Sequence, residues 1–287
     1  MKPSPISVGI PTFGRGLRLA ETLEHLAECD PPPAEIIVHV DQSDGRLERE
    51  LRTRFPHLRI LSSAERVGPG GGRHRCLLAA TQPFLVSFDD DSWPTDRKFF
   101  GEVARLFELY PRAAILAASI YYPDQPRPEC IPDVKIVTDY AGSGHAIRLN
   151  AYIQTAGYID RPYAYGVEEV DLAMQLYSLD WAILKCRSLR VFHDTQHAHH
   201  SKADIVASKV QNVALMAFLR YPVQLWPRGL LQLGNVISNM IKCRRFAGLG
   251  EGLLGIPVTL FRYKSCRRQL PAAKIRSYLN ARQRLPS

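Results

Sequence analysis

Apolar strand-like runs alternate with helical stretches through the first 120 residues of this 287-residue chain. The spacing predicts strands over 7–13, 35–40, 58–61, 84–88 and 113–120, and helices over 17–29, 47–55, 73–80 and 98–110. Short apolar runs separated by helices are typical of an α/β fold with a mostly parallel sheet and helices on both faces. Such sheets bind ligands beyond the carboxyl ends of their strands.

The pattern loosens after residue 120. Prolines interrupt 121–138, which we therefore expect to be a loop. Helices are predicted over 167–179 and 202–219, a strand over 181–186, and a strand or turn over 189–192. This length predicts one large domain with a smaller part attached.

The six cysteines are scattered and form no Cys-x-x-Cys pair, and residues 1–5 carry no apolar secretory region. This pattern is typical of reduced thiols in a cytoplasmic protein.

Three consecutive carboxylates, Asp89 to Asp91, end the apolar run that begins at Phe84. Carboxylates this close repel one another, and a divalent cation among them removes the repulsion. Oxygen ligands in this number suit Mg²⁺ or Mn²⁺. The alternative is that Asp91 or Ser92 caps a helix that begins near Pro94. Because capping accounts for only one acid, we predict a metal site.

Two other predicted strands end in polar or glycine-rich segments. Asp41 and Asp44 follow the second strand, where they would either form Asx turns or accept hydrogen bonds from a nucleotide base or ribose. A glycine-rich turn over 66–73 follows the third strand and opens a helix. Its backbone N–H groups would suit a phosphate, although the spacing matches neither a Walker loop nor a dinucleotide-binding motif.

Glu168, Glu169 and Asp171 lie in the first turn of the helix predicted over 167–179. An acidic residue stabilises a helix N-terminus by about 0.3–1 kcal/mol. This small effect does not by itself account for three acids within four residues. We interpret one of them as a general base.

The histidines of 193–200 allow two interpretations. His193 and His197 have the spacing of a zinc metalloprotease helix, but the segment follows a strand and has no apolar helical face. We therefore expect His193 to join the carboxylates on one metal, and His197, His199 and His200 to lie in a solvated loop.

Taken together, these motifs resemble those of the family 2 glycosyltransferases, which have the GT-A fold. The matching segments are Ile10–Arg15, Val40–Asp44, Glu65–Arg73, Phe88–Asp91, Gly157–Tyr158, Tyr165–Asp171 and Val191–His193. The ordered set is specific, although no single member is. The resemblance implies a Rossmann-like GT-A catalytic domain over 1–220, followed by a basic helical segment over 221–287.

The resemblance also implies a nucleoside-diphosphate sugar as the donor. The donor-binding residues that it implies are Pro11, Thr12, Phe13, Arg15, Asp41, Asp44, Gly68, Arg73, Asp89 and Asp90. Asp41 resembles the aspartate that recognises the base. Asp89 and Asp91 resemble the pair that holds the diphosphate through Mg²⁺ or Mn²⁺, and His193 resembles a histidine that some members add to this metal.

Two positions depart from the family pattern. The family usually has Glu-Asp where this chain has Glu168-Glu169, which leaves the catalytic base open between Glu169, at the matching position, and Asp171. His74 stands where the family usually has Asn.

The implied reaction is one displacement, in which a carboxylate takes the proton of an acceptor hydroxyl and the anomeric configuration inverts. We expect transfer of a hexose or deoxyhexose to a glycan or lipid-linked acceptor, in bacterial cell-surface polysaccharide or glycolipid synthesis. A sugar nucleotidyltransferase would need a basic triphosphate loop, and residues 12–15 contain one arginine. The chain has no RNP, KH or zinc-finger motif, so no nucleic-acid partner is expected.

The basic residues are concentrated at the C-terminus. From Arg220 onward, 13 Lys and Arg accompany one acid, Glu251, for a net charge of +12, whereas the first 219 residues carry −3. Apolar residues recur at helical spacing over 230–241, and no apolar run approaches the ~20 residues of a membrane span. We predict a basic amphipathic segment that places a peripheral protein on an anionic membrane surface, with a helix packed on the catalytic domain as the alternative.

Overall fold

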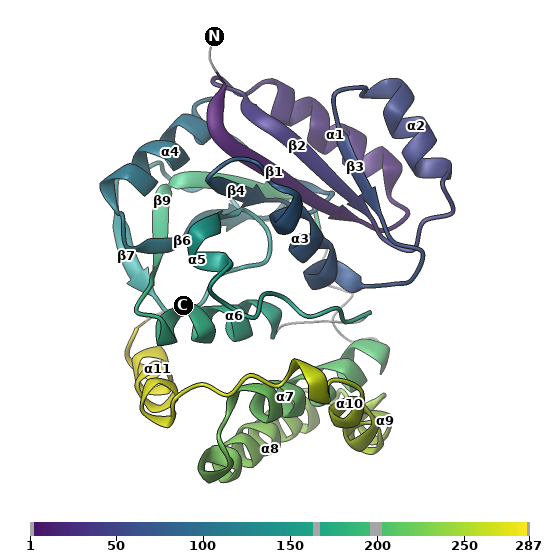
Figure 1. The fold of residues 1–287 in the computed structure, drawn as a ribbon, viewed down its shortest axis with the longest axis vertical. Helices are drawn as coiled ribbons and strands as arrows, with labels where there is room; N and C mark the ends of the chain where they lie inside the picture. Colours follow the sequence, from purple (N-terminus) through teal and green to yellow (C-terminus); the bar gives the residue numbers. More distant parts are fainter. Residues whose placement is uncertain (1–2, 163–166, 196–202, 286–287) are drawn as a thin grey trace.

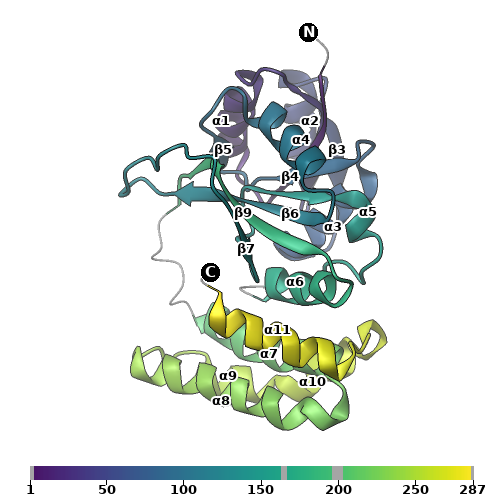
Figure 2. The same cartoon turned by 90° about the vertical axis from the view of Figure 1, so that its left-hand side faces the viewer.

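The computed structural model describes residues 3–162, 167–195 and 203–285. Within these residues, nine strands form one sheet, with helices on both of its faces and a layer of C-terminal helices beneath it (Figures 1 and 2). The strand order is β3-β2-β1-β4-β8-β6-β9-β5, and β7 pairs with β9. The predicted α/β fold with a C-terminal helical appendage is confirmed.

The first half of the sheet is parallel, as predicted. Its elements are β1 (Ser4–Thr12), α1 (Gly16–Ala27), β2 (Pro33–Val40), α2 (Arg46–Arg54), β3 (Arg59–Ser62), α3 (Gly68–Ala79) and β4 (Phe84–Ser87). β1 is central, because it pairs in parallel with both β2 and β4. The carboxyl ends of these strands therefore meet at one edge, where Thr12, Asp41 and Asp89 lie.

The second half of the sheet is mixed. Its elements are β5 (Ser92–Pro94), α4 (Phe99–Leu109), β6 (Ala113–Tyr121), β7 (Val134–Val137), β8 (His145–Arg148), α5 (Leu149–Tyr152), α6 (Glu168–Ser178) and β9 (Ala182–His193). β8 lies antiparallel between β4 and β6, whereas β6 and β9 are parallel.

The structure excludes one alternative and corrects two local predictions in this half. Pro94 does not start a helix, because Ser92–Pro94 form strand β5 against the end of β9. The predicted loop over 121–138 contains strand β7. The ranges 181–186 and 189–192 do form strand, but they belong to one continuous element, β9. In each case strand pairing with a distant segment fixes a backbone that the local sequence leaves open.

Alternate strand residues supply the two hydrophobic cores on the two faces of the sheet. Val38 and Val86 enter the core beneath α1, α2 and α4. Their neighbours Ile37 and Leu85 enter the core beneath α3, α6, α7 and α11. This period of two is what strands with both faces buried require.

The C-terminal helices are α7 (Ala203–Arg220), α8 (Trp226–Lys242), α9 (Leu249–Leu254), α10 (Ile256–Arg262) and α11 (Ala272–Arg284). α7 lies between the sheet domain and the outer helices α8, α9 and α10 (Figure 2). Because α7 packs against both layers, the domain boundary after residue 220 stays a prediction.

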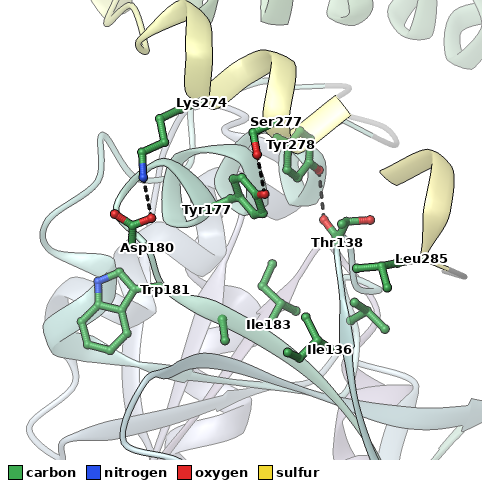
Figure 3. A pocket seen from close by; sticks show the side chains of 12 residues that line it. Ile136, Thr138, Tyr177, Asp180, Trp181, Ile183, Lys274, Ser277, Tyr278 and Leu285 are labelled. Atoms are coloured by element: carbon green, nitrogen blue, oxygen red, sulfur yellow. Dashed lines mark hydrogen bonds and ion pairs between the residues drawn. The ribbon is translucent and has the colours of Figure 1, made fainter. Parts of the chain in front are cut away.

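Helix α11 returns from the outer layer to the sheet domain and fastens the two together (Figure 3). The Tyr278 hydroxyl donates to the Thr138 carbonyl at 3.0 Å, and the hydroxyls of Tyr177 and Ser277 lie 2.9 Å apart. Lys274 forms an ion pair with an aspartate, Asp180, at the end of α6. These polar groups line the pocket drawn in Figure 3, and they are engaged with one another.

Candidate active site

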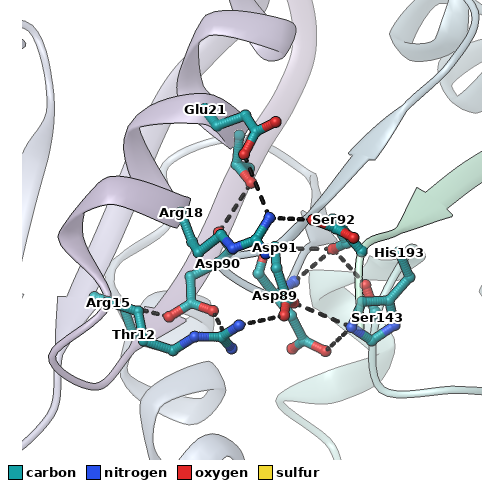
Figure 4. A network of polar contacts seen from close by, with 12 residues as sticks. Thr12, Arg15, Arg18, Glu21, Asp89, Asp90, Asp91, Ser92, Ser143 and His193 are labelled. Atoms are coloured by element: carbon teal, nitrogen blue, oxygen red, sulfur yellow. Dashed lines mark hydrogen bonds and ion pairs between the residues drawn. The ribbon is translucent and has the colours of Figure 1, made fainter. Parts of the chain in front are cut away.

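The acidic run after β4 lies in a network of charged and polar side chains (Figure 4). Asp90 is buried and accepts a hydrogen bond from the Thr12 hydroxyl at 2.7 Å. Arg15 bridges two of the acids, since its Nη1 lies 2.9 Å from Asp90 Oδ1 and its Nη2 lies 2.6 Å from Asp91 Oδ2. Asp90 therefore faces the β1–α1 loop and is held by protein groups, and Asp91 also contacts this loop, through its Oδ2 atom.

Asp89, Asp91 and His193 converge on one point. Each offers one ligand atom, and these three atoms lie within 4.8 Å of one another. His193 Nε2 is 3.1 Å from Asp91 Oδ1 and 3.7 Å from Asp89 Oδ2. Strand β5 creates this arrangement, because Ser92 pairs with His193 across the β5–β9 ladder. Two carboxylates and one imidazole form a donor set that suits Mn²⁺ or Mg²⁺.

The pKa values of Asp90 and Asp91 are shifted in opposite directions. Burial raises the pKa of Asp90 to about 6, although Thr12 and Arg15 act to lower it. Burial also acts to raise the pKa of Asp91, but hydrogen bonds from His193 and Arg15 outweigh it and hold this pKa below its usual value. Asp91 is therefore anionic at neutral pH, as a metal ligand must be.

A buried arginine connects the acidic run to helix α6. Arg73, in α3, has its Nη2 atom 2.5 Å from Asp89 Oδ1 and its Nη1 atom 3.7 Å from Glu169 Oε1. Burial acts to lower the pKa of Arg73, but Asp89 and Glu169 outweigh it and the guanidinium stays charged. The backbone of Gly142 closes over this contact, because a Cβ atom there would lie 2.9 Å from Arg73 Nη2 and closer still to Glu169 Oε1.

Glu168 and Glu169 begin helix α6 and are largely withdrawn from solvent. Burial raises the pKa of both carboxyls, and the charge of Arg73 acts to lower it. A carboxylate with a raised pKa takes a proton more readily near neutral pH, as a general base must.

Asp171 makes different contacts. Its Oδ1 accepts from Arg220 Nε at 2.6 Å and its Oδ2 from Arg220 Nη2 at 2.8 Å. Arg220 is completely buried, and Gln175 Nε2 donates to Asp171 Oδ2 at 3.2 Å. Asp171 thus joins α6 to α7, and the assignment of the base to Glu169 or Asp171 stays a prediction.

Asp41 anchors the glycine-rich turn. Its two carboxylate oxygens accept the backbone N–H groups of Val67, at 2.8 Å, and Gly68, at 2.9 Å. The backbone N–H groups at the start of α3 therefore bind a carboxylate of the protein. A helix N-terminus favours an anion, and Asp41 supplies one here. Gly68 has φ +72°, and a Cβ atom there would collide with the Arg161 carbonyl, so the turn requires glycine.

The remaining predicted donor residues lie along the same edge. Phe13 is half-exposed, and the Arg66 guanidinium lies 4.5 Å from its ring centroid. Pro11 contacts the turn, since a Cβ atom on Gly72 would lie 2.7 Å from the Pro11 Cβ. Asp44 is exposed and accepts the Arg46 backbone N–H at 3.0 Å, which is the Asx-turn alternative.

Sequence reasoning missed several residues around the site. Ser143, next to Gly142, lies with its hydroxyl 2.5 Å from that of Ser92. The missed Tyr140 lies with its hydroxyl 2.8 Å from that of Tyr158, which belongs to the motif Gly157–Tyr158. No periodicity or charge run marks Gly142 or Ser143, since they act through tertiary contacts. The motif residues Tyr165 and Gly166, and His197, His199 and His200, lie outside the described residues.

Solved structures with similar folds were found despite low sequence identity. S. aureus TarS with UDP-GlcNAc has a TM-score of 0.56 and 17% identity, over 74% of this chain and 66% of that chain. The mannosyltransferase PcManGT from Pyrobaculum calidifontis, with GDP-Man and Mn²⁺, has a TM-score of 0.58 and 15% identity, over 99% and 87%. GalNAc-T7 with UDP, GalNAc and Mn²⁺ has a TM-score of 0.59 and 13% identity, over 77% and 49%. The class is therefore the GT-A fold of glycosyltransferases.

The sequence profile of "Glycosyl transferase family 2" matches residues 7–156, just over half of the chain. The protein belongs to this glycosyltransferase family. No curated protein sequence matches it. The family match does not favour the nucleotidyltransferase or nucleic-acid-binding alternatives.

Proposed function

We propose that this protein is an inverting glycosyltransferase that moves a sugar from a nucleoside-diphosphate sugar to an acceptor hydroxyl. The observation that carries the proposal is the chain of contacts from His193 and Asp91 through Asp89 and Arg73 to Glu169. It joins a divalent-cation donor set to a buried carboxylate across the carboxyl edge of the sheet. Those are the two groups that sugar transfer from a nucleotide needs.

The donor side comprises Asp89, Asp91 and His193, which would hold Mg²⁺ or Mn²⁺. When bound, such a cation stabilises the negative charge that develops on a departing nucleoside diphosphate. Arg73 adds a fixed positive charge beside Asp89, and in this proposal the base and ribose bind near Phe13, next to the turn that Asp41 anchors. The structures of PcManGT with GDP-Man and Mn²⁺ and of GalNAc-T7 with UDP, GalNAc and Mn²⁺ support this assignment.

We assign the general base to Glu169. Its carboxylate lies in the buried space that Arg73 and Gly142 define, whereas both oxygens of Asp171 are engaged by Arg220. The proton of the acceptor hydroxyl passes to Glu169 as the oxygen attacks the anomeric carbon and the diphosphate leaves. One displacement of this kind inverts the anomeric configuration.

The acceptor in this proposal is a glycan or a lipid-linked sugar at the cytoplasmic face of a membrane, in bacterial cell-surface polysaccharide or glycolipid synthesis. The transferred sugar is a hexose or deoxyhexose. The structures of TarS with UDP-GlcNAc and of PcManGT with GDP-Man, which have a similar fold, support a donor of that size.

The test compares Glu169→Gln with the neighbouring Glu168→Gln. Glutamine keeps the shape of the side chain but cannot accept the proton, so Glu169→Gln should bind the nucleotide sugar normally while transfer falls by about 10²-fold or more. Glu168→Gln, the matched control, should retain most of the transfer. Full transfer by Glu169→Gln would refute the assignment of the base, and failure of the wild-type protein to bind any nucleotide sugar would refute the function itself.

A further inference from the structure

The outer helices expose an unusual amount of apolar surface. Among the residues that the structure describes, 17 large hydrophobic residues are exposed, and ten of them lie from Val223 to Phe261. Among the most exposed are Leu230 (68%), Leu231 (69%), Phe246 (59%), Leu254 (82%), Val258 (62%) and Phe261 (70%). Soluble proteins expose single hydrophobic residues everywhere, but a concentration in one layer marks an interaction surface.

This surface faces away from the catalytic domain. One side of α7 contacts the sheet domain through Arg220, which pairs with Asp171. The opposite side holds the outer helices, because Val206 and Val210 pack against Met240 of α8. Figure 2 shows α8 at the edge of the molecule farthest from the sheet. The buried residues of the outer helices are thus those that contact α7, and their exposed hydrophobic side chains are directed outward.

Positive charge surrounds the apolar side chains. Lys242 ends α8, Arg244 and Arg245 follow it, and Arg262 and Lys264 follow Val258 and Phe261; all five are exposed. Glu251 is the only acid in the chain after Arg220. The segment therefore combines apolar contact area with a nearly uncompensated cationic rim.

We propose that α8, α9 and α10 form a docking face for an anionic lipid bilayer, with their exposed hydrophobic side chains at the boundary between headgroups and acyl chains. An apolar face with a basic rim is the composition that interfacial helices use. No helix among the described residues has the length and apolarity to cross a membrane. A second copy of this chain would bring two cationic rims together, so charge complementarity favours the lipid surface.

The docking face fixes where the active site stands. Asp171 connects α6 to α7, and Glu169 lies two residues earlier in the first turn of α6. The catalytic base is therefore separated from the exposed side of the docking face by α7 and by the thickness of the outer helices. The axes of two packed helices lie about 8–10 Å apart. A lipid-linked acceptor would approach from this side; that part of the inference rests on the proposed function, whereas bilayer binding does not.

Vesicle flotation of the full-length protein tests the inference without any substrate. We expect binding to phosphatidylglycerol–phosphatidylcholine vesicles and at least tenfold weaker binding to phosphatidylcholine alone. Lys242→Gln/Arg244→Gln/Arg245→Gln should bind about 10²-fold more weakly, because each basic side chain near an anionic leaflet strengthens binding about fivefold. The double variant Leu254→Asp/Phe261→Asp should bind these vesicles at least tenfold more weakly than the wild type.

Matched controls carry equal changes on the catalytic domain. They are Leu78→Asp/Leu109→Asp, at residues 64% and 57% exposed, and Arg49→Gln/Arg52→Gln/Arg54→Gln on α2. These variants should float like the wild type. Equal flotation of all variants, or concentration-dependent dimerisation through Leu254 and Phe261 with no vesicle binding, would overturn the inference. Nucleotide-sugar binding by the docking-face variants, followed by thermal shift, should be unchanged, which separates this result from a failure of the glycosyltransferase proposal.

Discussion

The Asp171→Asn substitution separates the two acids that sequence reasoning left as candidates for the base. Asp171 accepts two short hydrogen bonds from Arg220, and the exposed fraction of Arg220 is 0%. Asparagine has nearly the same shape but carries no charge, so the buried guanidinium would lose its counter-ion. Removing one partner of a buried ion pair destabilises a protein by about 3–5 kcal/mol. For a chain of this length, that corresponds to a fall in Tm of about 5–10 °C.

Thermal unfolding and transfer activity are measured on the same samples. Asp171→Asn should unfold at the lower temperature and retain transfer at temperatures where it is folded. Glu169→Gln should unfold within a few degrees of the wild type and lose transfer. A double variant, Asp171→Leu/Arg220→Met, should recover much of the stability, since apolar residues can replace a buried ion pair with little loss. An Asp171→Asn protein with unchanged Tm and no transfer would refute this reasoning and move the base to Asp171.

Three further predictions concern the site. Asp91→Ala removes a metal ligand and should lower turnover by about 10²-fold or more, and full activity of this variant in the presence of chelator would exclude the metal site. Burial raises the pKa of Glu169 above its ordinary value of 4.5, and protonation of this carboxylate at low pH should abolish transfer. The acid limb of the profile of kcat/KM against pH should therefore lie above pH 4.5. A limb at or below pH 4.5 would contradict this prediction. Gly142→Ala should reduce transfer at least tenfold with normal folding, since the added methyl group would displace Arg73 and Glu169, whereas wild-type turnover would show that this contact is unimportant.

The parallel half of the fold could be predicted because its signals are local. Buried strands such as β1 and β4 are short, mostly apolar runs, and the helices between them have one apolar face. β7 escaped prediction because it lies among prolines and leaves Ile136 62% exposed, so its identity as a strand depends on pairing with β9. β5 is only three residues long and depends on the same partner.

The candidate site likewise has a part that local sequence predicts and a part that depends on tertiary contacts. The acidic run after β4 is contiguous in sequence, so its chemistry could be predicted. The contact between Arg73 and Glu169 joins residues 96 positions apart, and no local pattern predicts it. Arg220 shows the opposite error, because it counted among the basic residues of the tail although it is buried and neutralised by Asp171. Charge read from sequence does not distinguish a buried, paired group from a solvated one.

The central claim, that Asp89 and Asp91 hold a nucleoside-diphosphate sugar through a divalent cation, is tested most directly by thermal shift with a panel of sugar nucleotides, with and without Mn²⁺. A ligand at a hundredfold excess over its Kd stabilises the native state by about 2.7 kcal/mol, which for this chain raises Tm by about 5 °C. We predict that at least one nucleotide sugar produces this shift with Mn²⁺ and a much smaller one in chelator, and that Asp89→Ala/Asp91→Ala abolishes it. An equal shift in chelator, or in the double variant, would contradict the claim.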